Sequence, residues 1–254
     1  MVRSIFIIIF LLIASLAFGE NPVSWWKAES NQANAYLGHS VGSGDFNGDT
    51  YDDVISGAFC YANPEVMEGM VFVWYGSSDG PNNGTPGDPT NADWKAESNL
   101  VFGQIGFSVS SGDFNGDTYD DILIGARYTE DGENNEGMIF VWYGSASGLG
   151  DNGTPANAGW KAESNQASAS LSTVSSGDFN GDTYDDVVAG ARHYNNGNNY
   201  EGMVFVWYGS ETGLGPDGDP TNADWKAESN QSNRDLDRKR TSLKSSQLVF
   251  SYDV

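Results

Sequence analysis

The sequence repeats itself, and this limits what the chain can fold into more than any other feature. The hexapeptide Trp-Lys-Ala-Glu-Ser-Asn begins at Trp26, Trp94, Trp160 and Trp225, at spacings of 68, 66 and 65 residues. Between these copies, Gly-Asp-Phe-Asn-Gly-Asp-Thr-Tyr-Asp-Asp occurs three times, each at a corresponding place. Self-similarity at a fixed period indicates one supersecondary unit copied in tandem. The period is long for a helical solenoid and fits four short strands with their loops.

Within one copy, the residue pattern predicts β-strands. Residues 40–44 and 54–59 are short runs of small or β-branched residues on either side of an Asp-rich loop. Residues 71–75 are apolar on both faces, so this strand must be covered on both sides. The Trp-Lys-Ala-Glu-Ser segments alternate instead, which suits an outer edge strand. The predicted fold is all-β: a partial β-propeller of three four-stranded antiparallel blades, with an extra outer strand at residues 26–30 in front.

Charge and composition exclude several classes of protein. The 254 residues carry 12 Lys plus Arg against 35 Asp plus Glu, which gives a formal charge of −23. Such an acidic chain argues against nucleic-acid binding, because phosphate groups need a basic surface. Aromatic residues make up 13% of the chain, enough to bury a core, so disorder is not expected. The single cysteine excludes an intrachain disulfide and a cysteine-rich zinc site.

The first residues predict export rather than structure. Arg3 precedes an apolar run from Ile5 to Ile13, and small residues follow up to Gly19. This is the pattern of a cleaved secretory signal peptide, residues 1–19. The run is shorter than the roughly 20 apolar residues of a membrane-spanning helix, and no later stretch is apolar enough. We therefore expect a secreted or cell-surface protein whose mature chain has no membrane span. Glycosylation sequons, which fit a secreted glycoprotein, begin at Asn83, Asn152 and Asn230.

The Asp-rich loops, residues 45–53, 113–121 and 178–186, carry the chemistry. In each loop, oxygen-bearing side chains stand at places 1, 3, 5 and 9, and a Tyr backbone carbonyl would supply place 7. Alternate side chains of a tightly curved loop converge, and an all-oxygen shell suits Ca²⁺ better than Mg²⁺, zinc or copper. The predicted ligands, for one Ca²⁺ per loop, are Asp45, Asn47, Asp49, Tyr51, Asp53, Asp113, Asn115, Asp117, Tyr119, Asp121, Asp178, Asn180, Asp182, Tyr184 and Asp186.

Two alternatives compete with a calcium site. Asp, Asn and Gly also favour solvated turns. Clustered carboxylates repel one another unless a cation is present, and this favours the metal site. An EF-hand needs flanking helices and an acidic ligand at place 12, where Ser56, Ile124 and Ala189 stand, so that motif is excluded.

The repeated motifs resemble FG-GAP repeats, the blades of the β-propeller in integrin α subunits. The matching residues are Leu37-Gly38 or Ile105-Gly106, then Ser-Val, Gly-Asp-Phe-Asn-Gly-Asp, Tyr-Asp-Asp and a closing Gly-Ala, over about residues 22 to 230. The resemblance implies that each loop binds Ca²⁺ between strands and that the opposite face binds partners. Place 6 of the loop, often Gly in that family, is Thr here. A left-handed backbone at that place would cost about 1 kcal/mol.

The number of copies and the end of the chain depart from the family pattern. A seven-bladed ring would need on the order of 460 residues, so the repeats within 20–230 predict an open arc, a fragment of a propeller. Such an arc either self-associates to complete a propeller or is marginally stable alone. Residues 231–254 are a divergent basic tail, with five Lys or Arg and three Asp. A tail that docks on an acidic partner and a truncated or frame-shifted gene end are both open interpretations.

Two functions remain open at this point. The resemblance implies an extracellular binding or cell-adhesion module, integrin-α-like, in which Ca²⁺ is structural and the partner is an unknown extracellular protein or glycan. The alternative is a lectin-like polysaccharide-binding propeller, or the non-catalytic propeller part of an extracellular hydrolase or lyase. No unrepeated acid–base constellation appears, so we expect no enzyme activity. The loops expected to form the binding surface are those where the copies differ most, residues 61–64, 128–131 and 194–196.

Overall fold

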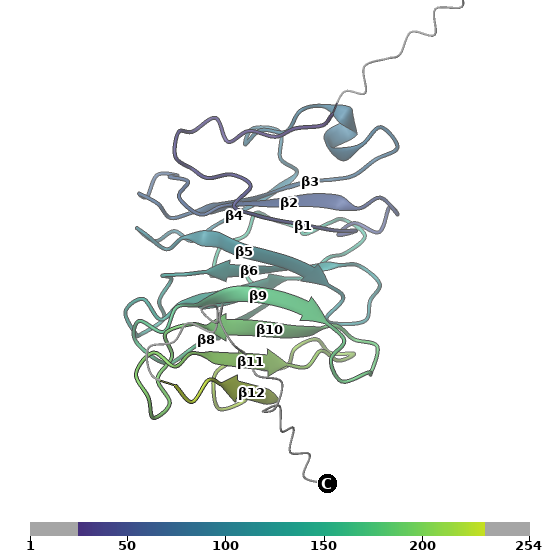
Figure 1. Cartoon of the computed structure of the whole chain (residues 1–254). Helices are drawn as coiled ribbons and strands as arrows, with labels where there is room; N and C mark the ends of the chain where they lie inside the picture. The colour runs from purple at the N-terminus through teal and green to yellow at the C-terminus, as the bar shows by residue number, and fades with distance from the viewer. Residues whose placement is uncertain (1–24, 232–254) are drawn as a thin grey trace, which may run out of the picture.

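The structure, a computed structural model, describes residues 25–231 as a stack of three four-stranded sheets (Figure 1). Blade 1 consists of β1 (Ser40–Gly44), β2 (Asp53–Ala58), β3 (Met70–Trp74) and β4 (Trp94–Glu97). Blade 2 consists of β5 (Ile105–Gly112), β6 (Asp121–Ala126), β7 (Met138–Trp142) and β8 (Trp160–Glu163). Blade 3 consists of β9 (Leu171–Gly177), β10 (Asp186–Ala191), β11 (Met203–Trp207) and β12 (Trp225–Glu228). A 3-10 turn, Pro81–Gly84, lies between β3 and β4.

Each blade is an antiparallel meander in which strands pair in chain order, from β1 to β4 in blade 1. The register is set at the Asp-rich loop, where Gly44 pairs with Asp53. The first strands of successive blades lie side by side, β1 against β5 and β5 against β9. The predicted all-β fold of three four-stranded antiparallel blades is therefore confirmed.

The third strand of each blade is buried on both faces, as its sequence predicts. Every residue of β3 is buried. Phe72 and Trp74 contribute to one hydrophobic cluster, and Val71 and Val73 contribute to the next. Because side chains alternate between the faces of a strand, one apolar strand supplies two layers of core.

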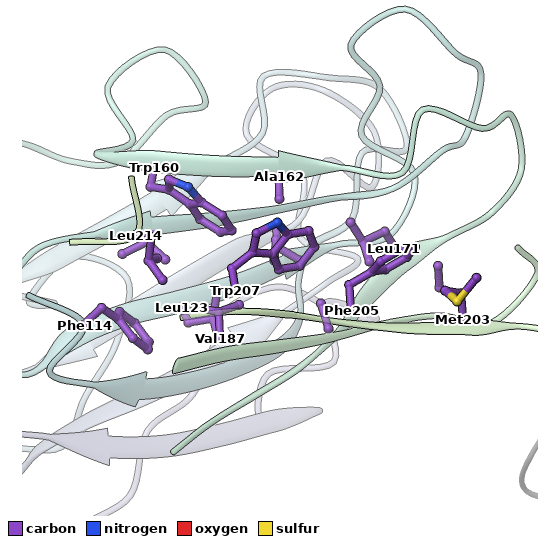
Figure 2. Close-up of a cluster of buried hydrophobic side chains, with 14 of the residues drawn as sticks. Phe114, Leu123, Trp160, Ala162, Leu171, Val187, Met203, Phe205, Trp207 and Leu214 are labelled. Carbon is purple, nitrogen blue, oxygen red and sulfur yellow. The ribbon is translucent and has the colours of Figure 1, made fainter. Parts of the chain in front are cut away.

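The core lies between the blades rather than within any one of them. Figure 2 shows the cluster between blades 2 and 3, where Leu123 and Trp160 of blade 2 meet Val187, Phe205 and Trp207 of blade 3. Aromatic side chains of this size bury about 150–250 Å² each. A single blade has no way to cover its own faces, so stability depends on stacking.

The fourth strand of each blade is an outer edge with one buried side. In β4, Trp94 and Ala96 are buried while Lys95 and Glu97 are half-buried, which confirms the predicted alternation. The strand also reaches the next blade, because Ala96 forms a parallel bridge with Gly153. The outer strand therefore joins two blades.

A tryptophan pair strengthens each of these joints. The Trp94 ring lies edge-on to Trp142 of blade 2, with centroids 5.4 Å apart, and its Nε1 donates to the carbonyl of Asp151 at 2.9 Å. The corresponding pair, Trp160 and Trp207, joins blades 2 and 3 at 5.5 Å.

The predicted extra strand at residues 26–30 needs a correction. This segment forms one isolated parallel bridge, from Ala28 to Gly87, and no strand. The other three copies each pair antiparallel with the strand before them, and no such strand precedes Trp26 among the described residues. The segment still occupies on blade 1 the place that β4 occupies on blade 2, with Trp26 and Trp74 at 5.5 Å.

The predicted signal peptide, residues 1–19, and all but the first residue of the predicted basic tail, 231–254, lie outside the described residues. Within residues 25–231, no helix has the length and apolar character needed to cross a membrane.

Candidate metal-binding loops and interblade pockets

The three Asp-rich loops lie at the same end of the stacked blades. Each loop joins the first strand of a blade to the second, and the first strands lie side by side. The loops are also bonded to one another. The Asp120 N–H donates to the carbonyl of Asp45 at 3.0 Å, and the Asp185 N–H donates to that of Asp113 at 3.0 Å. The loops thus form one continuous edge of the molecule.

Within the first loop, the predicted ligand side chains are bonded to the loop's own backbone. The carboxylate of Asp45 accepts the N–H groups of residues 48–50 at 2.8 to 3.1 Å. Asn47 Oδ1 accepts the Asp49 N–H at 2.9 Å, and Asp49 Oδ1 accepts the Tyr51 N–H at 2.9 Å. The side chains at places 1, 3 and 5 are therefore bonded within their own loop.

The second and third loops repeat this arrangement. Asp113 accepts three successive N–H groups at 2.7 to 3.1 Å, and Asp178 does so at 2.6 to 3.1 Å. The expected left-handed backbone at place 6 is also present, with φ of 76°, 75° and 81° at Thr50, Thr118 and Thr183. A β-branched residue is strained in this region.

The Asp at place 9 ties each loop to the rest of its blade. Asp53, Asp121 and Asp186 are fully buried. Asp53 Oδ2 accepts the Phe46 N–H at 2.9 Å, and Asp53 Oδ1 accepts the Gly76 N–H, just after β3, at 2.7 Å. One carboxylate thus connects the loop to the third strand.

Burial perturbs these carboxylates strongly. Desolvation raises the pKa of Asp53 to about 6 and that of Asp121 to about 8, although two backbone N–H groups lower each value. The carboxylates at places 1 and 5 of the same loop raise both pKa values further, because like charges disfavour ionisation. The pKa of Asp186 is raised for the same reasons. Each loop therefore concentrates negative charge that a cation would neutralise.

The donor chemistry of these loops fits Ca²⁺, but the side chains are not gathered into a metal shell. Among residues 25–231, no group of three or more His, Cys, Asp or Glu side chains is arranged to hold a metal ion. The oxygens at places 1, 3 and 5 face N–H groups of their own loop instead. A calcium site would require these carboxylates to turn toward the ion. The ligand assignment, with the carbonyls of the three Tyr residues, stays a prediction.

One repeated set of buried acids was not predicted from the sequence: Glu68, Glu136 and Glu201. Each is at most 1% exposed and stands just before the third strand of its blade. Glu136 Oε1 accepts the Asp131 N–H at 2.7 Å, and the other two accept the equivalent N–H groups of Asn63 and Asn196. The Glu-Gly-Met tripeptide that recurs before each apolar strand was the signal for them.

The surroundings of these acids differ between blades. In blade 3, Asn198 Nδ2 donates to Glu201 Oε2 at 3.0 Å. The corresponding residue in blade 1 is Glu65, and the Oε2 atoms of Glu65 and Glu68 are both buried without a hydrogen-bond partner in the described chain. Desolvation, followed by the charges of Glu97 and Glu65, raises the pKa of Glu68 to about 7.

The loops that follow the second strands, including residues 61–64 and 128–131, leave the blades at the end opposite the Asp-rich loops. They border two equivalent pockets between neighbouring blades. The pocket between blades 1 and 2 has a volume of about 230 Å³ and is lined by Tyr61, Asn63, Lys95, Glu97, Asn152 and Thr154, among others. The pocket between blades 2 and 3, of about 240 Å³, is more acidic and is lined by Asp131, Lys161, Glu163, Asp217 and Asp219, among others.

Sequence comparison places these features in a known context. A model of the FG-GAP repeat matches residues 105–142 and 170–207, which span β5–β7 and β9–β11. The chain is 29% identical over 139 residues to integrin alpha-PS2 of Drosophila melanogaster, matching 50% of this chain and 9% of the relative. It is 27% identical over 188 residues to integrin alpha-V of Gallus gallus, matching 70% and 17%.

A different relative is phosphatidylinositol-glycan-specific phospholipase D of Bos taurus, 28% identical over 194 residues, 68% of this chain and 20% of the relative. The chain therefore spans no more than about a fifth of the length of these three relatives. The matches of the FG-GAP model fall on the second and third blades, and blade 1 has the same strand order and the same loop. The chain thus contains FG-GAP repeats, folded as propeller blades and similar to those of integrin alpha subunits.

Proposed function

We propose that this chain is an extracellular binding or cell-adhesion module whose blades are stabilised by Ca²⁺. The observation that carries the proposal is the threefold recurrence of one oxygen-rich loop at one end of the stacked blades. Each loop contains a fully buried Asp whose pKa is raised by burial and by neighbouring carboxylates. Acidic groups collected in this way favour the binding of a divalent cation.

The residues that would hold the ion are those at places 1, 3, 5, 7 and 9 of each loop. The ion supplies positive charge, which offsets the repulsion among the carboxylates. Asp53 also bonds to the backbone after β3, and Asp45 bonds through its carbonyl to the loop of blade 2. Fixing one loop therefore fixes a strand pair and an interblade interface. Because Ca²⁺ would bind the folded chain and not the unfolded chain, its binding adds to the stability of the fold by mass action.

The partner surface lies at the opposite end, around the two interblade pockets. The loops 61–64 and 128–131, where the copies differ in sequence, contribute to this surface. In the pocket between blades 2 and 3, Lys161 is already paired with Asp131 at 2.6 Å, while Glu163, Asp217 and Asp219 add negative charge. An acidic surface favours a basic protein as partner, because complementary charge increases both the association rate and specificity.

A binding screen tests this function. The purified chain is applied to a panel of extracellular-matrix proteins and to a glycan array, each with Ca²⁺ or with EDTA. We expect calcium-dependent binding to a basic matrix protein that weakens when Asp217 and Asp219 are both changed to Asn. The control for a general effect of acidic charge is Glu211→Gln, which removes a single exposed acid near the Asp-rich loops. Binding that weakens equally in the control would contradict the proposed surface.

The second candidate is a lectin-like propeller, or the non-catalytic propeller part of a larger hydrolase or lyase. The similarity to phosphatidylinositol-glycan-specific phospholipase D supports it. The same screen separates the two candidates, because this one predicts signals on the glycan array and none on the matrix proteins.

The proposal that the protein is secreted depends on the apolar N-terminal sequence, residues 1–19. Expression with the native N-terminus should release a product into the medium that begins at Glu20. A product that keeps Arg3 would contradict the signal-peptide assignment.

A further inference from the structure

The two interblade interfaces are built from the same contacts. Where blade 2 meets blade 1, the ring of Tyr119 lies over Gly48 so closely that a Cβ there would be 2.4 Å from it. The Asp45 N–H donates to Asp120 Oδ2 at 2.8 Å, and the Ser145 N–H donates to the carbonyl of Phe46 at 3.2 Å. The equivalent contacts between blades 2 and 3 are Tyr184 on Gly116, Asp113 to Asp185, and Ser210 to Phe114.

The free face of blade 3 has one half of this interface. Among residues 25–231, no neighbouring atom lies within 4 Å of the position that a Cβ would take at Gly181, the equivalent of Gly48. Phe179 is 54% exposed, whereas Phe46 and Phe114 are fully buried. Trp225 is 50% exposed, although the equivalent residues of β4 and β8 are buried. Within the described part of the chain, none of these groups has the neighbour that a following blade supplies for its equivalents in blades 1 and 2.

The free face of blade 1 has the other half. Tyr51, the equivalent of the tyrosine that covers Gly48, is 44% exposed, and Asp52, the equivalent of Asp120, is also exposed. Blades 1 and 3 stand at opposite ends of the stack (Figure 1). The free face of blade 3 is therefore complementary to the free face of blade 1, and neither face is complementary to a second copy of itself.

The segment Trp26–Glu29 adds a second, independent argument. The segment packs on blade 1 in the way that an outer strand packs on the blade after it, and the Trp26 Nε1 donates to the Thr85 carbonyl at 2.8 Å. Residues 26–32 have the same sequence as residues 225–231, which include β12. The segment therefore carries all the side chains needed to pair with β11, and it lacks only that strand as a partner.

We infer that the chain self-associates head to tail. The free face of blade 3 in one copy docks on the free face of blade 1 in a second copy, with Tyr51 covering Gly181. The Trp26–Glu29 segment of the second copy replaces β12 on β11 of the first. The exchange is favourable because the Trp26 ring already lies edge-on against Trp74, whereas Trp225 is half exposed. A contact between unlike faces can extend to further copies.

Sedimentation velocity with a reductant, across a wide range of protein concentration, tests the docking. We expect species larger than one chain that increase with concentration and with salt, because the charge of −23 opposes association. Phe179→Ser and Tyr51→Ser lie on opposite faces, and each should raise the dissociation constant at least about tenfold. The matched control is Phe102→Ser, which changes an equally exposed aromatic residue in the connection between blades 1 and 2.

A single-chain mass at every concentration would overturn the inference, as would an equal effect of the control variant. The strand exchange has its own test in a Cys60→Ser background. Val204 pairs with Ala227 of β12, so Val204→Cys in one chain should form a disulfide with Ala28→Cys in another under mild oxidation. Val101→Cys, at an exposed site, replaces Ala28→Cys as the control. Association without the specific disulfide would overturn the exchange.

Discussion

At the scale of the residue, strain and buried charge recur at equivalent places of each repeat. Thr50, Thr118 and Thr183 all adopt positive φ, although a β-branched side chain is disfavoured there. The loop sequence determines this conformation, because the carboxylate at place 1 accepts the N–H of each of these Thr residues. The strain is therefore offset by a bond that any other residue at place 6 can also make.

Replacing one of these threonines should stabilise the fold. For Thr118→Asn we expect a gain of about 1 kcal/mol in the free energy of unfolding, since Asn tolerates the left-handed region. Thermal or denaturant unfolding measures the change.

The same substitution elsewhere provides the control. Thr173 is exposed in strand β9 and is absent from the residues with positive φ. Thr173→Asn should lower stability, because Asn is disfavoured in strands. If both variants change stability in the same direction, the strain at place 6 is not the cause.

The buried acids before the third strands make stability depend on pH. The pKa of Glu68 is raised to about 7, above its usual value near 4.5, so the folded chain binds more protons than the unfolded chain between these values. Stability contributed by this group is present at low pH and is lost as pH rises toward 7 and above. Blade 3 avoids this loss, because Asn198 donates to Glu201.

Glu65→Asn should give blade 1 the Asn–Glu hydrogen bond that blade 3 has. Because the new Asn side chain supplies a donor to Glu68, we expect the free energy of unfolding to rise by about 1–3 kcal/mol at pH 8. The gain should shrink at pH 5, where Glu68 is protonated. The reverse change, Asn198→Glu, should lower the melting temperature more at pH 8 than at pH 5. Melting temperatures of both variants that show no dependence on pH would contradict this account of the buried acids.

At the scale of the element, strands of the same sequence contribute differently to the free energy of unfolding, because the contribution depends on whether a following blade packs against the strand. β8 and β12 share the sequence Trp-Lys-Ala-Glu, but the Trp160 side chain is 1% exposed and that of Trp225 is 50% exposed. The Trp160 ring lies edge-on against Trp207, and its Nε1 donates to the Pro216 carbonyl at 2.9 Å. An outer strand is thus stabilising when a following blade is present to receive it.

Alanine substitution should show this difference. Trp160→Ala should lower the free energy of unfolding by about 3–5 kcal/mol, because it opens a cavity between two blades. Trp225→Ala in the identical strand should cost several-fold less. Equal losses would mean that the outer strand stabilises its own blade rather than the joint between blades.

The sequence predicts the elements well where local pattern decides them. The first strand of blade 1 agrees with residues 40–44, and the third is displaced by one residue, Met70–Trp74 instead of 71–75. The prediction of an outer strand at Trp26 is wrong, because a strand needs a neighbouring strand to pair with and the local residue pattern does not show whether one is present. The partial exposure of Trp225 has the same origin. Likewise, the spacing predicts that the loop oxygens converge, but it does not predict that these oxygens accept hydrogen bonds from backbone N–H groups of their own loop.

At the scale of the whole molecule, acidic charge is opposed by few cations. The formal charge is −23, and Lys161 with Asp131 is the one ion pair within the described part of the chain. Such a charge destabilises a compact state through self-repulsion. The stacked apolar strands hold the blades together against this repulsion, and each Ca²⁺ would remove two charges at the edge where carboxylates are closest.

Calcium titration of the metal-free chain, by calorimetry, tests this account most directly. We predict about three Ca²⁺ per chain, with dissociation constants on the order of 10⁻⁴ to 10⁻³ M, and a melting temperature that falls in EDTA. Asp49→Ala, Asp117→Ala and Asp182→Ala should each remove about one site. Absence of binding heat, together with a melting temperature that EDTA leaves unchanged, would contradict the central claim that these loops are calcium sites.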